Sequence, residues 1–489
     1  MSNDHHLGRL NAARIAKLAA GPLIGVMVWL ALRTWAPGLA PNAALTAGLA
    51  VWMGLWWMTE ALSIEITGLL PIALVPVLGL GTLKETCAPY ADEVIFLFLG
   101  GMIIGQALEK SGLHRRFALA VITVVGASPR RLIAGFLCAT AFISMWVSNA
   151  AATVMMMPIA ISVCLLLDRE QRPANAEEPT ARQGFEASLL IAVAFGASIG
   201  GVGTLVGTPP MAQMAAFLKK ELGTTLSFQE WLSIGGPVVL LMLPLAWAAI
   251  TIRGPRMPDH NLAGVRQLVQ QEVRDLGPMR WPEWAVLAVF LLAVFAWVFS
   301  KQLGVGDATV AITASLVLFI LPWDGRWSKQ LITWEDASRL PWGVLVMFGG
   351  GLSLAAAISR NGLDKAIADA AQGLHGAPFL LVLFVLALGA VALTEFASNT
   401  ALVAAGLPVV AALAKALDVP PVPACMVLSL AASLGFMMPA GTAPNALVFS
   451  TGRMTMGQMM RAGVRLDLIT AVLVPLVIWG AWKLGMVPG

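Results

Sequence analysis

The sequence carries an internal duplication built around an apolar stretch with a polar tip. Residues 144–158 read SMWVSNAAATVMMMP, and residues 394–408 read TEFASNTALVAAGLP. In both copies a Ser-Asn pair lies inside an apolar run, with a proline ten residues after the serine, and the copies are 250 residues apart. Residues 94–113 also align with residues 344–363 without a gap. This pattern indicates two repeats in one chain, each with one polar tip.

The composition predicts that both repeats lie in a membrane. Of the 489 residues, 58% are hydrophobic and only 12% are charged, and the mean hydropathy is +0.80. Many apolar runs approach the ~20 residues needed to cross a hydrocarbon core. The net charge of +4 is small and lies mostly in loops, which indicates topology signals rather than nucleic-acid binding. We therefore expect an all-α polytopic membrane protein.

The order of the segments divides the chain into four parts. Residues 1–18 form a basic tail that we expect in the cytoplasm, and residues 19–252 form the first repeat. Residues 253–282 form a basic cytoplasmic loop, and residues 283–489 form the second repeat. We expect about eleven crossings of the plasma or inner membrane, with an odd number in each repeat, which inverts the second repeat relative to the first.

Each repeat contains two interruptions of its apolar pattern. A straight crossing would leave a Ser-Asn pair in mid-span without a partner, so residues 132–166 and 378–416 are predicted to form re-entrant helical hairpins. The segments SIGGVGTLVGTPP, within residues 187–218, and SLGFMMPAGTAPN, within residues 424–452, predict broken helices. Half-helix ends at membrane depth offer free N–H groups to anions and carbonyl oxygens to cations.

The side chains at these four interruptions are uncharged. Hydroxyl and amide groups can donate to carboxylate oxygens and can also bind Na⁺ through their own oxygens. Because no Arg, Lys or His lies in or beside them, a bound anion needs helix dipoles and co-bound cations to offset its charge. The candidate side chains are Ser148, Asn149, Thr208, Ser398, Asn399, Thr400, Thr442 and Asn445.

Two structural alternatives compete with a binding site. A single Ser-Asn pair in a membrane helix more often joins helices by hydrogen bonds, and a lone GTPP is more often only a kink. The recurrence of the same tip and the same break in the same order favours a binding site. Glu395, three residues before Ser398, has two interpretations. It is either a functional ionisable group at membrane depth or a group that pins the hairpin by accepting backbone N–H bonds.

At these residues the chain resembles the divalent anion:sodium symporter family, which includes dicarboxylate, citrate and sulfate transporters. The resemblance covers nearly the whole chain and rests on the two Ser-Asn tips, TEFASNTA, GTPP and TAPN. It implies a homodimer, surrounded by membrane lipid, of protomers with eleven transmembrane helices and two re-entrant hairpins. It also implies inverted-topology repeats and a transport domain that moves like an elevator against a scaffold domain.

The resemblance also implies two sodium sites and a substrate site. One Na⁺ would bind near Ser144, Ser148, Asn149 and the Gly207 carbonyl, and the other near Thr394, Ala397, Asn399 and the backbone at Gly441 and Ala443. A small anionic substrate would meet Ser148-Asn149 and Ser398-Asn399-Thr400, with Thr208 and Thr442 close by. The chain departs from the family at Ala150, which replaces a threonine on the substrate face, at Met211, which replaces an asparagine, and at Ala443, which replaces a proline.

The leading functional interpretation is a secondary transporter that imports a di- or tricarboxylate with sodium by an elevator mechanism. The substrate would be succinate, malate, fumarate, α-ketoglutarate or citrate. The alternatives are a sodium-coupled sulfate-type transporter and a sodium-independent or proton-coupled exchanger. The sodium-independent exchangers of this family place a cationic side chain near the sodium sites, and no such side chain is visible in this sequence. A channel fits the paired tips poorly. Scattered loop histidines and sparse acidic residues in the membrane give an integral-membrane enzyme little support.

Overall fold

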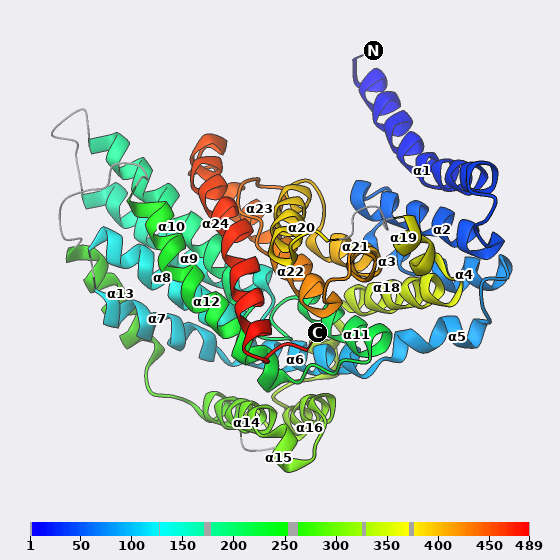
Figure 1. Ribbon diagram of the computed structural model, residues 1–489. Helices are drawn as coiled ribbons and strands as arrows, with labels where there is room; N and C mark the ends of the chain where they lie inside the picture. Colours follow the sequence, from blue (N-terminus) through cyan, green and yellow to red (C-terminus); the bar gives the residue numbers. More distant parts are fainter. Residues whose placement is uncertain are drawn as a thin grey trace.

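The structure is a computed structural model that describes residues 2–126, 128–170, 178–252, 263–324, 329–370 and 376–488. The described chain is all-helical (Figure 1). The helices of the first part are α1 (Ser2–Trp35), α2 (Pro41–Thr59), α3 (Ile64–Thr67), α4 (Leu70–Val77), α5 (Leu83–Cys87), η1 (Ala88–Ala91), α6 (Glu93–Ser111), α7 (Leu113–Val125), α8 (Pro129–Ser144), α9 (Asn149–Glu170), α10 (Glu178–Gly201), α11 (Pro209–Leu222) and α12 (Phe228–Thr251).

The second part begins with the surface helix α13 and then follows the same order. Its helices are α13 (Ala263–Leu276), α14 (Trp281–Val298), α15 (Ser300–Leu303), α16 (Asp307–Ile320), α17 (Trp334–Ser338), α18 (Trp342–Arg360), α19 (Leu363–Ala370), α20 (Phe379–Thr394), α21 (Asn399–Ala416), α22 (Pro421–Ser433), α23 (Ala443–Phe449) and α24 (Met456–Lys483). The run from α18 to α24 therefore corresponds helix by helix to the run from α6 to α12.

Eight helices of the described chain are long and apolar enough to cross a membrane. Five shorter apolar segments accompany them: 64–77, 149–165, 307–320, 379–394 and 421–433. Helices of this length cover only part of the ~30 Å hydrocarbon core, as the predicted interrupted crossings require. The polytopic all-helical fold is confirmed. The count of eleven crossings and the inversion of the repeats stay predictions.

Two expected loops are in part helical. The tail at residues 2–18 is continuous with the first span, because α1 runs from Ser2 to Trp35. Within the expected loop 253–282, residues 253–262 lie outside the described residues, and α13 occupies Ala263–Leu276. This segment places apolar residues at helical spacing among charged ones, and its Val269 is buried, so it forms an amphipathic surface helix.

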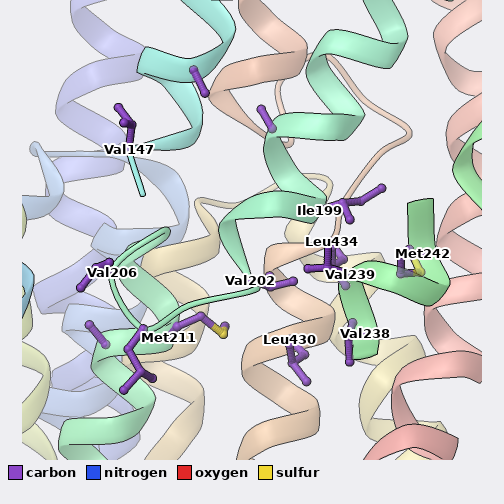
Figure 2. Close-up of a cluster of buried hydrophobic side chains, with 14 of the residues drawn as sticks. Val147, Ile199, Val202, Val206, Met211, Val238, Val239, Met242, Leu430 and Leu434 are labelled. Carbon is purple, nitrogen blue, oxygen red and sulfur yellow. The ribbon is translucent and has the colours of Figure 1, made fainter. Parts of the chain in front are cut away.

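The main hydrophobic core surrounds the two broken spans. Figure 2 shows apolar side chains from the linker after α10, among them Val202 and Val206, in one buried cluster with Val239 of α12 and Leu430 and Leu434 of the second broken span. These residues are at most 5% exposed. The core therefore forms where the interruptions of the two repeats meet.

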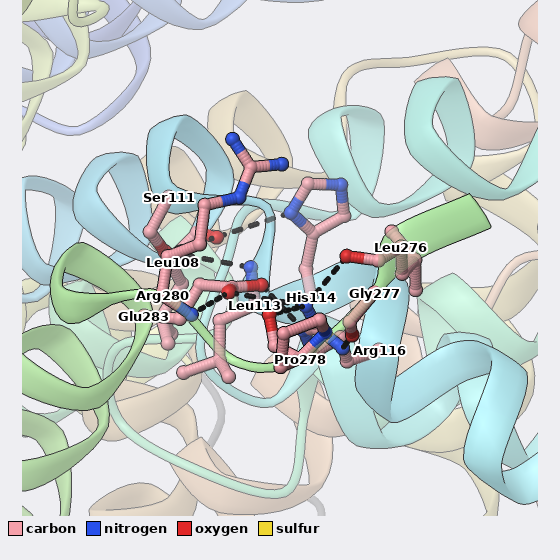
Figure 3. A network of polar contacts seen from close by, with 10 residues as sticks. All are labelled: Leu108, Ser111, Leu113, His114, Arg116, Leu276, Gly277, Pro278, Arg280 and Glu283. Carbon is pink, nitrogen blue, oxygen red and sulfur yellow. Dashed lines mark hydrogen bonds and ion pairs between the residues drawn. The ribbon is translucent and has the colours of Figure 1, made fainter. Parts of the chain in front are cut away.

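A polar network ties α7 to the start of the second repeat (Figure 3). The Arg116 guanidinium donates to both carboxylate oxygens of Glu283 and to the carbonyl oxygens at the end of α13 and in the turn that follows it. Nearby, burial lowers the pKa of His114. Its ring Nδ1 lies 3.0 Å from the Leu108 carbonyl oxygen. The junction between the repeats is thus fixed to α7 by directed hydrogen bonds.

Candidate functional site

At the tip of the first repeat, three oxygen atoms lie close together and share the single proton of one hydroxyl group. Helix α8 ends at Ser144 and α9 begins at Asn149, so the two side chains face each other across a four-residue turn. Ser144 Oγ lies 2.9 Å from Asn149 Oδ1 and 2.7 Å from the Ala197 carbonyl oxygen. Because a hydroxyl has one proton to donate, at least one of these close oxygen pairs is without a proton. Such an excess of acceptors suits a bound cation.

The tip of the second repeat has the same arrangement. Helix α20 ends at Thr394 and α21 begins at Asn399. Thr394 Oγ1 lies 2.7 Å from Asn399 Oδ1 and 2.6 Å from the Ala432 carbonyl oxygen. The sequence duplication is therefore matched by a duplicated set of converging oxygens, each formed by a hairpin tip and the broken span of the same repeat.

Glycines let the break of each repeat approach its tip. A Cβ atom at Gly207 would lie 2.5 Å from the Gly201 carbonyl oxygen and 2.9 Å from the Ser144 carbonyl oxygen, and one at Gly201 would overlap Asn149 Oδ1. In the second repeat, a Cβ atom at Gly441 would lie 3.0 Å from Glu395 Oε2. The separations at Gly207 and Gly201 are too short for a side chain, so the backbone itself lines the first tip, whereas at Gly441 the fit against the end of the Glu395 side chain is only tight.

The first linker, residues 202–208, is fixed to its tip by a side chain that the sequence patterns did not single out. Thr204 Oγ1 donates to the Met145 carbonyl oxygen at 2.5 Å and accepts from the Gly207 N–H at 3.1 Å. In the second repeat Glu395 has this role. It is 2% exposed and accepts from the N–H groups of Met437 at 3.0 Å and Met438 at 2.5 Å. It thus accepts backbone N–H bonds, as the pinning alternative expected, and these bonds tie the hairpin to the broken span.

The other predicted site residues differ in exposure. At the first tip Ser148 is exposed and Asn149 and Ala150 are half-buried. At the second tip Ser398, Asn399 and Thr400 are half-buried, whereas Ala397 is buried. At the breaks Thr208, Gly207, Gly441 and Thr442 are buried, and Ala443 is exposed. The Ser-Asn pairs are thus accessible at least in part, whereas these break residues are buried except Ala443.

The two repeats pack on each other reciprocally. The second half of the second broken span, α23, packs against α9 and α10 of the first repeat. The second half of the first broken span, α11, packs against α21 and α22 of the second repeat. Phe195 of α10 also contacts Phe436 of the second linker edge to face, with ring centroids 4.8 Å apart. This exchange brings the two tips and the two breaks into one region.

Several buried polar atoms in this region have no hydrogen-bond partner. They are Ser198 Oγ in α10, the side-chain amide of Gln213 in α11 and Asn445 Oδ1 in α23. A buried polar group without a partner is costly, so these atoms indicate water or ligand near the breaks. The described residues contain no group of three His, Cys, Asp or Glu that could hold a metal ion. A cation here would rely on hydroxyl, amide and carbonyl oxygens.

Comparison with known proteins identifies close sequence relatives over the full length. The family model that describes the sodium:sulfate symporter transmembrane region matches residues 12–487. The sodium-dependent dicarboxylate transporter SdcS of Staphylococcus saprophyticus is 35% identical over 487 residues, which covers 98% of this chain and 93% of that protein. SdcS of Staphylococcus aureus strain USA300 is 35% identical over 478 residues, covering 96% and 91%.

Solved structures with a similar fold are more distant in sequence. The Alcanivorax borkumensis YdaH transporter aligns with a TM-score of 0.56 and 17% identity, over 82% of this chain and 88% of that one. MtrF of Neisseria gonorrhoeae, from a class of antimetabolite efflux pumps, aligns with a TM-score of 0.55 and 12% identity, over 84% of each chain. At these identities the similarity concerns the fold alone.

Proposed function

Because this chain belongs to the sodium:sulfate symporter family, we propose that it imports a di- or tricarboxylate together with sodium. The chain is a multi-pass membrane transporter and not an enzyme. The curated relatives are named sodium-dependent dicarboxylate transporters, which supports both the ion and the substrate class. Succinate, malate, fumarate, α-ketoglutarate and citrate are the candidate substrates.

The observation that carries this proposal is the duplicated set of oxygens at the two tips. One Na⁺ would bind beside Ser144, Asn149 and the Gly207 backbone, together with Ser148. The other would bind beside Thr394, Ala397, Asn399 and the backbone at Gly441 and Ala443. Each set has more oxygen lone pairs than protons at distances of 2.6–2.9 Å, so a small cation can replace a hydrogen bond there.

The anion would bind between the two tips. Ser148-Asn149 and Ser398-Asn399-Thr400 begin helices α9 and α21, so their free N–H groups and the positive ends of the helix dipoles favour a carboxylate. Thr208 and Thr442 precede α11 and α23 and offer two more helix N-termini. No cationic side chain hydrogen-bonds to these residues in the described chain, so bound sodium ions would offset the remaining negative charge. This requirement is the physical basis of the proposed coupling.

The proposed movement follows from which helices carry the site. The hairpins α8–α9 and α20–α21 and the broken spans α10–α11 and α22–α23 would travel together as the transport domain. The spans within residues 43–109 and 284–359 lack tips and would form the static scaffold and the contact between the protomers of a homodimer. The scaffold helix α6 meets the first tip at Gly105, where a Cβ atom would lie 3.0 Å from the Trp146 carbonyl oxygen.

The test is uptake by proteoliposomes, with and without an inward sodium gradient, of a panel of labelled succinate, citrate and sulfate. Asn149→Ala and Asn399→Ala each remove one of the three converging oxygens and a donor to the substrate. We expect both variants to lose uptake while they elute as folded protein on size exclusion. Asn361→Ala is the matched control, because Asn361 donates to the Leu80 and Ala357 carbonyl oxygens away from the tips.

The outcomes separate the alternatives. Normal uptake by either tip variant at limiting sodium would mean that the tip only joins helices. Uptake by the unmodified protein without a sodium gradient would support an exchanger instead. Uptake of sulfate in preference to every carboxylate would support the sulfate-type alternative.

A further inference from the structure

The linker between α22 and α23, residues 434–442, is fixed by acidic side chains on two sides. Three consecutive N–H groups of this linker donate to carboxylate oxygens. Phe436 donates to Asp467 Oδ1 of α24 at 3.0 Å, and Met437 and Met438 donate to Glu395. Asp467 is only 7% exposed. Non-helical backbone at membrane depth must have its polar groups satisfied, and here carboxylates satisfy the N–H groups.

Helix α24 touches this linker directly. One turn before Asp467, a Cβ atom at Gly463 would overlap the backbone of Phe436 and Met437. The close approach at glycine brings the Asp467 side chain within reach of the linker N–H, since residues four apart lie on the same helix face. Within the linker itself, the Met438 carbonyl oxygen accepts from the Gly441 N–H at 3.1 Å and from Asn445 Nδ2 at 3.1 Å.

The first repeat has a counterpart on its own last helix, α12. Trp231 Nε1 donates to the Val202 carbonyl oxygen at 3.0 Å, and Trp231 is fully buried. One turn later, a Cβ atom at Gly235 would lie 2.7 Å from the same carbonyl oxygen. Figure 2 shows Val202 in the buried cluster that includes α12. Each repeat therefore ends in a helix that contacts the linker of its own broken span. In each case one side chain of the helix forms a hydrogen bond to the linker backbone, and one glycine of the helix allows the close approach.

We propose that Trp231 and Asp467 are positioning residues that hold the two linkers in the form that completes the sodium sites. Neither residue supplies an oxygen to sodium in the sites proposed above. Each fixes the backbone on which Gly207 or Gly441 is carried, one by donating to a carbonyl oxygen and the other by accepting from an N–H. This inference rests on the proposed function, because it assigns the linkers to sodium binding.

The test is sodium binding measured without transport, as the sodium-dependent rise in melting temperature of the purified full-length protein, with choline as the control cation. Asp467→Leu removes the acceptor at similar volume, whereas Asp467→Asn keeps a carbonyl oxygen that can accept from Phe436. Trp231→Phe keeps an aromatic ring but removes the donor. Thr470→Val is the matched control, because the Thr470 hydroxyl on the same face of α24 is buried without a hydrogen-bond partner.

We expect D467L and W231F each to raise the sodium concentration for half-maximal stabilisation by about tenfold, as for the loss of one buried hydrogen bond. D467N should stay within about threefold of the unmodified protein, because its amide oxygen can still accept the bond. T470V should not change the sodium dependence. If D467L does not fold, W231F and D467N still test the idea.

Three results would overturn the inference. Variants that melt earlier at every sodium concentration with an unchanged midpoint would show that the two residues only stabilise the fold. A midpoint shift in D467N as large as that in D467L would show that some property of the acid other than its bond from the Phe436 N–H sets the sodium dependence. An unchanged sodium midpoint in W231F would overturn the part of the proposal that concerns Trp231 and the first repeat. An unmodified protein that sodium stabilises no more than choline would instead overturn the proposed function.

Discussion

Arg116 offers a sharp test of how the two repeats are joined. In the network of Figure 3 its guanidinium donates to both carboxylate oxygens of Glu283 and lies 2.8–3.0 Å from the carbonyl oxygens of Leu276, Gly277 and Pro278. The carbonyl contacts cap the C-terminal end of α13, and Glu283 lies in the first turn of α14. Arg116→Ala removes all of these bonds at once.

The expected cost follows from burial. The side chains of Arg116 and Glu283 are 18% and 5% exposed, so removal of the arginine leaves a nearly buried carboxylate without its cation. Breaking a buried pair costs about 3–5 kcal/mol. Glu283 keeps one bond from the Arg280 N–H at 2.6 Å, which favours the low end, about 3 kcal/mol. Arg116→Lys should fall between, because an ammonium cannot form the bidentate contact.

Arg115 is the matched control on the same helix. Its ion pair with Glu272 is 45% and 28% exposed, so Arg115→Ala should cost less than about 1 kcal/mol. The assay is thermal unfolding of purified protein at one scan rate, since unfolding of a large membrane protein is commonly irreversible. We expect R116A to melt several degrees below R115A. Equal melting temperatures for the two variants would refute the assignment of the junction's stability to this network.

Three further predictions concern transport. Ala150→Thr restores a hydroxyl on the proposed substrate face and should change relative affinities among carboxylates and sulfate by several-fold, about 1 kcal/mol, in competition uptake; an unchanged ranking would place residue 150 away from the substrate. Gly101→Val should reduce uptake, because its Cβ would lie 2.7 Å from a valine of the first linker, whereas Gly54→Ala, with open space around it, should not. With the exposed Cys87 and Cys138 replaced, Ala151→Cys beside the first tip should change its reactivity to an impermeant thiol reagent when sodium and substrate are added, whereas Lys84→Cys on the scaffold should not. Equal, ligand-independent labelling would favour local gating over an elevator.

The tips were predictable because their signal is local. In both repeats the helix boundary falls at the Ser-Asn pair: α9 begins at Asn149 and α21 at Asn399, and each preceding helix ends five residues earlier, at Ser144 and Thr394. A polar pair in an apolar run, repeated at a constant offset, is enough to place such a boundary. The resemblance places Ser144 beside Asn149, and the structure shows the two side chains in contact across this turn.

The remaining contacts of the site were not predictable from these patterns. The Ala197 and Ala432 carbonyl oxygens come from apolar helix segments 53 and 38 residues from the hydroxyls that contact them. A backbone carbonyl has no residue-type signature, so only the packing of the broken span against the tip reveals it. The partners of Glu395 were missed for the same reason. The glycine-rich breaks gave a signal for close backbone approach, but not for which backbone would approach.

The reciprocal packing of the breaks has a consequence for coupling. Each set of converging oxygens is built from the tip and the break of one repeat, yet the half-helix that leaves each break is packed on the other repeat, α11 on α21 and α22, and α23 on α9 and α10. Close-packed interiors do not deform smoothly. A displacement of one tip and break relative to the other would therefore separate buried apolar faces. The two proposed sodium sites should accordingly move as one unit, and an ion bound at either site would restrict the backbone that carries the other.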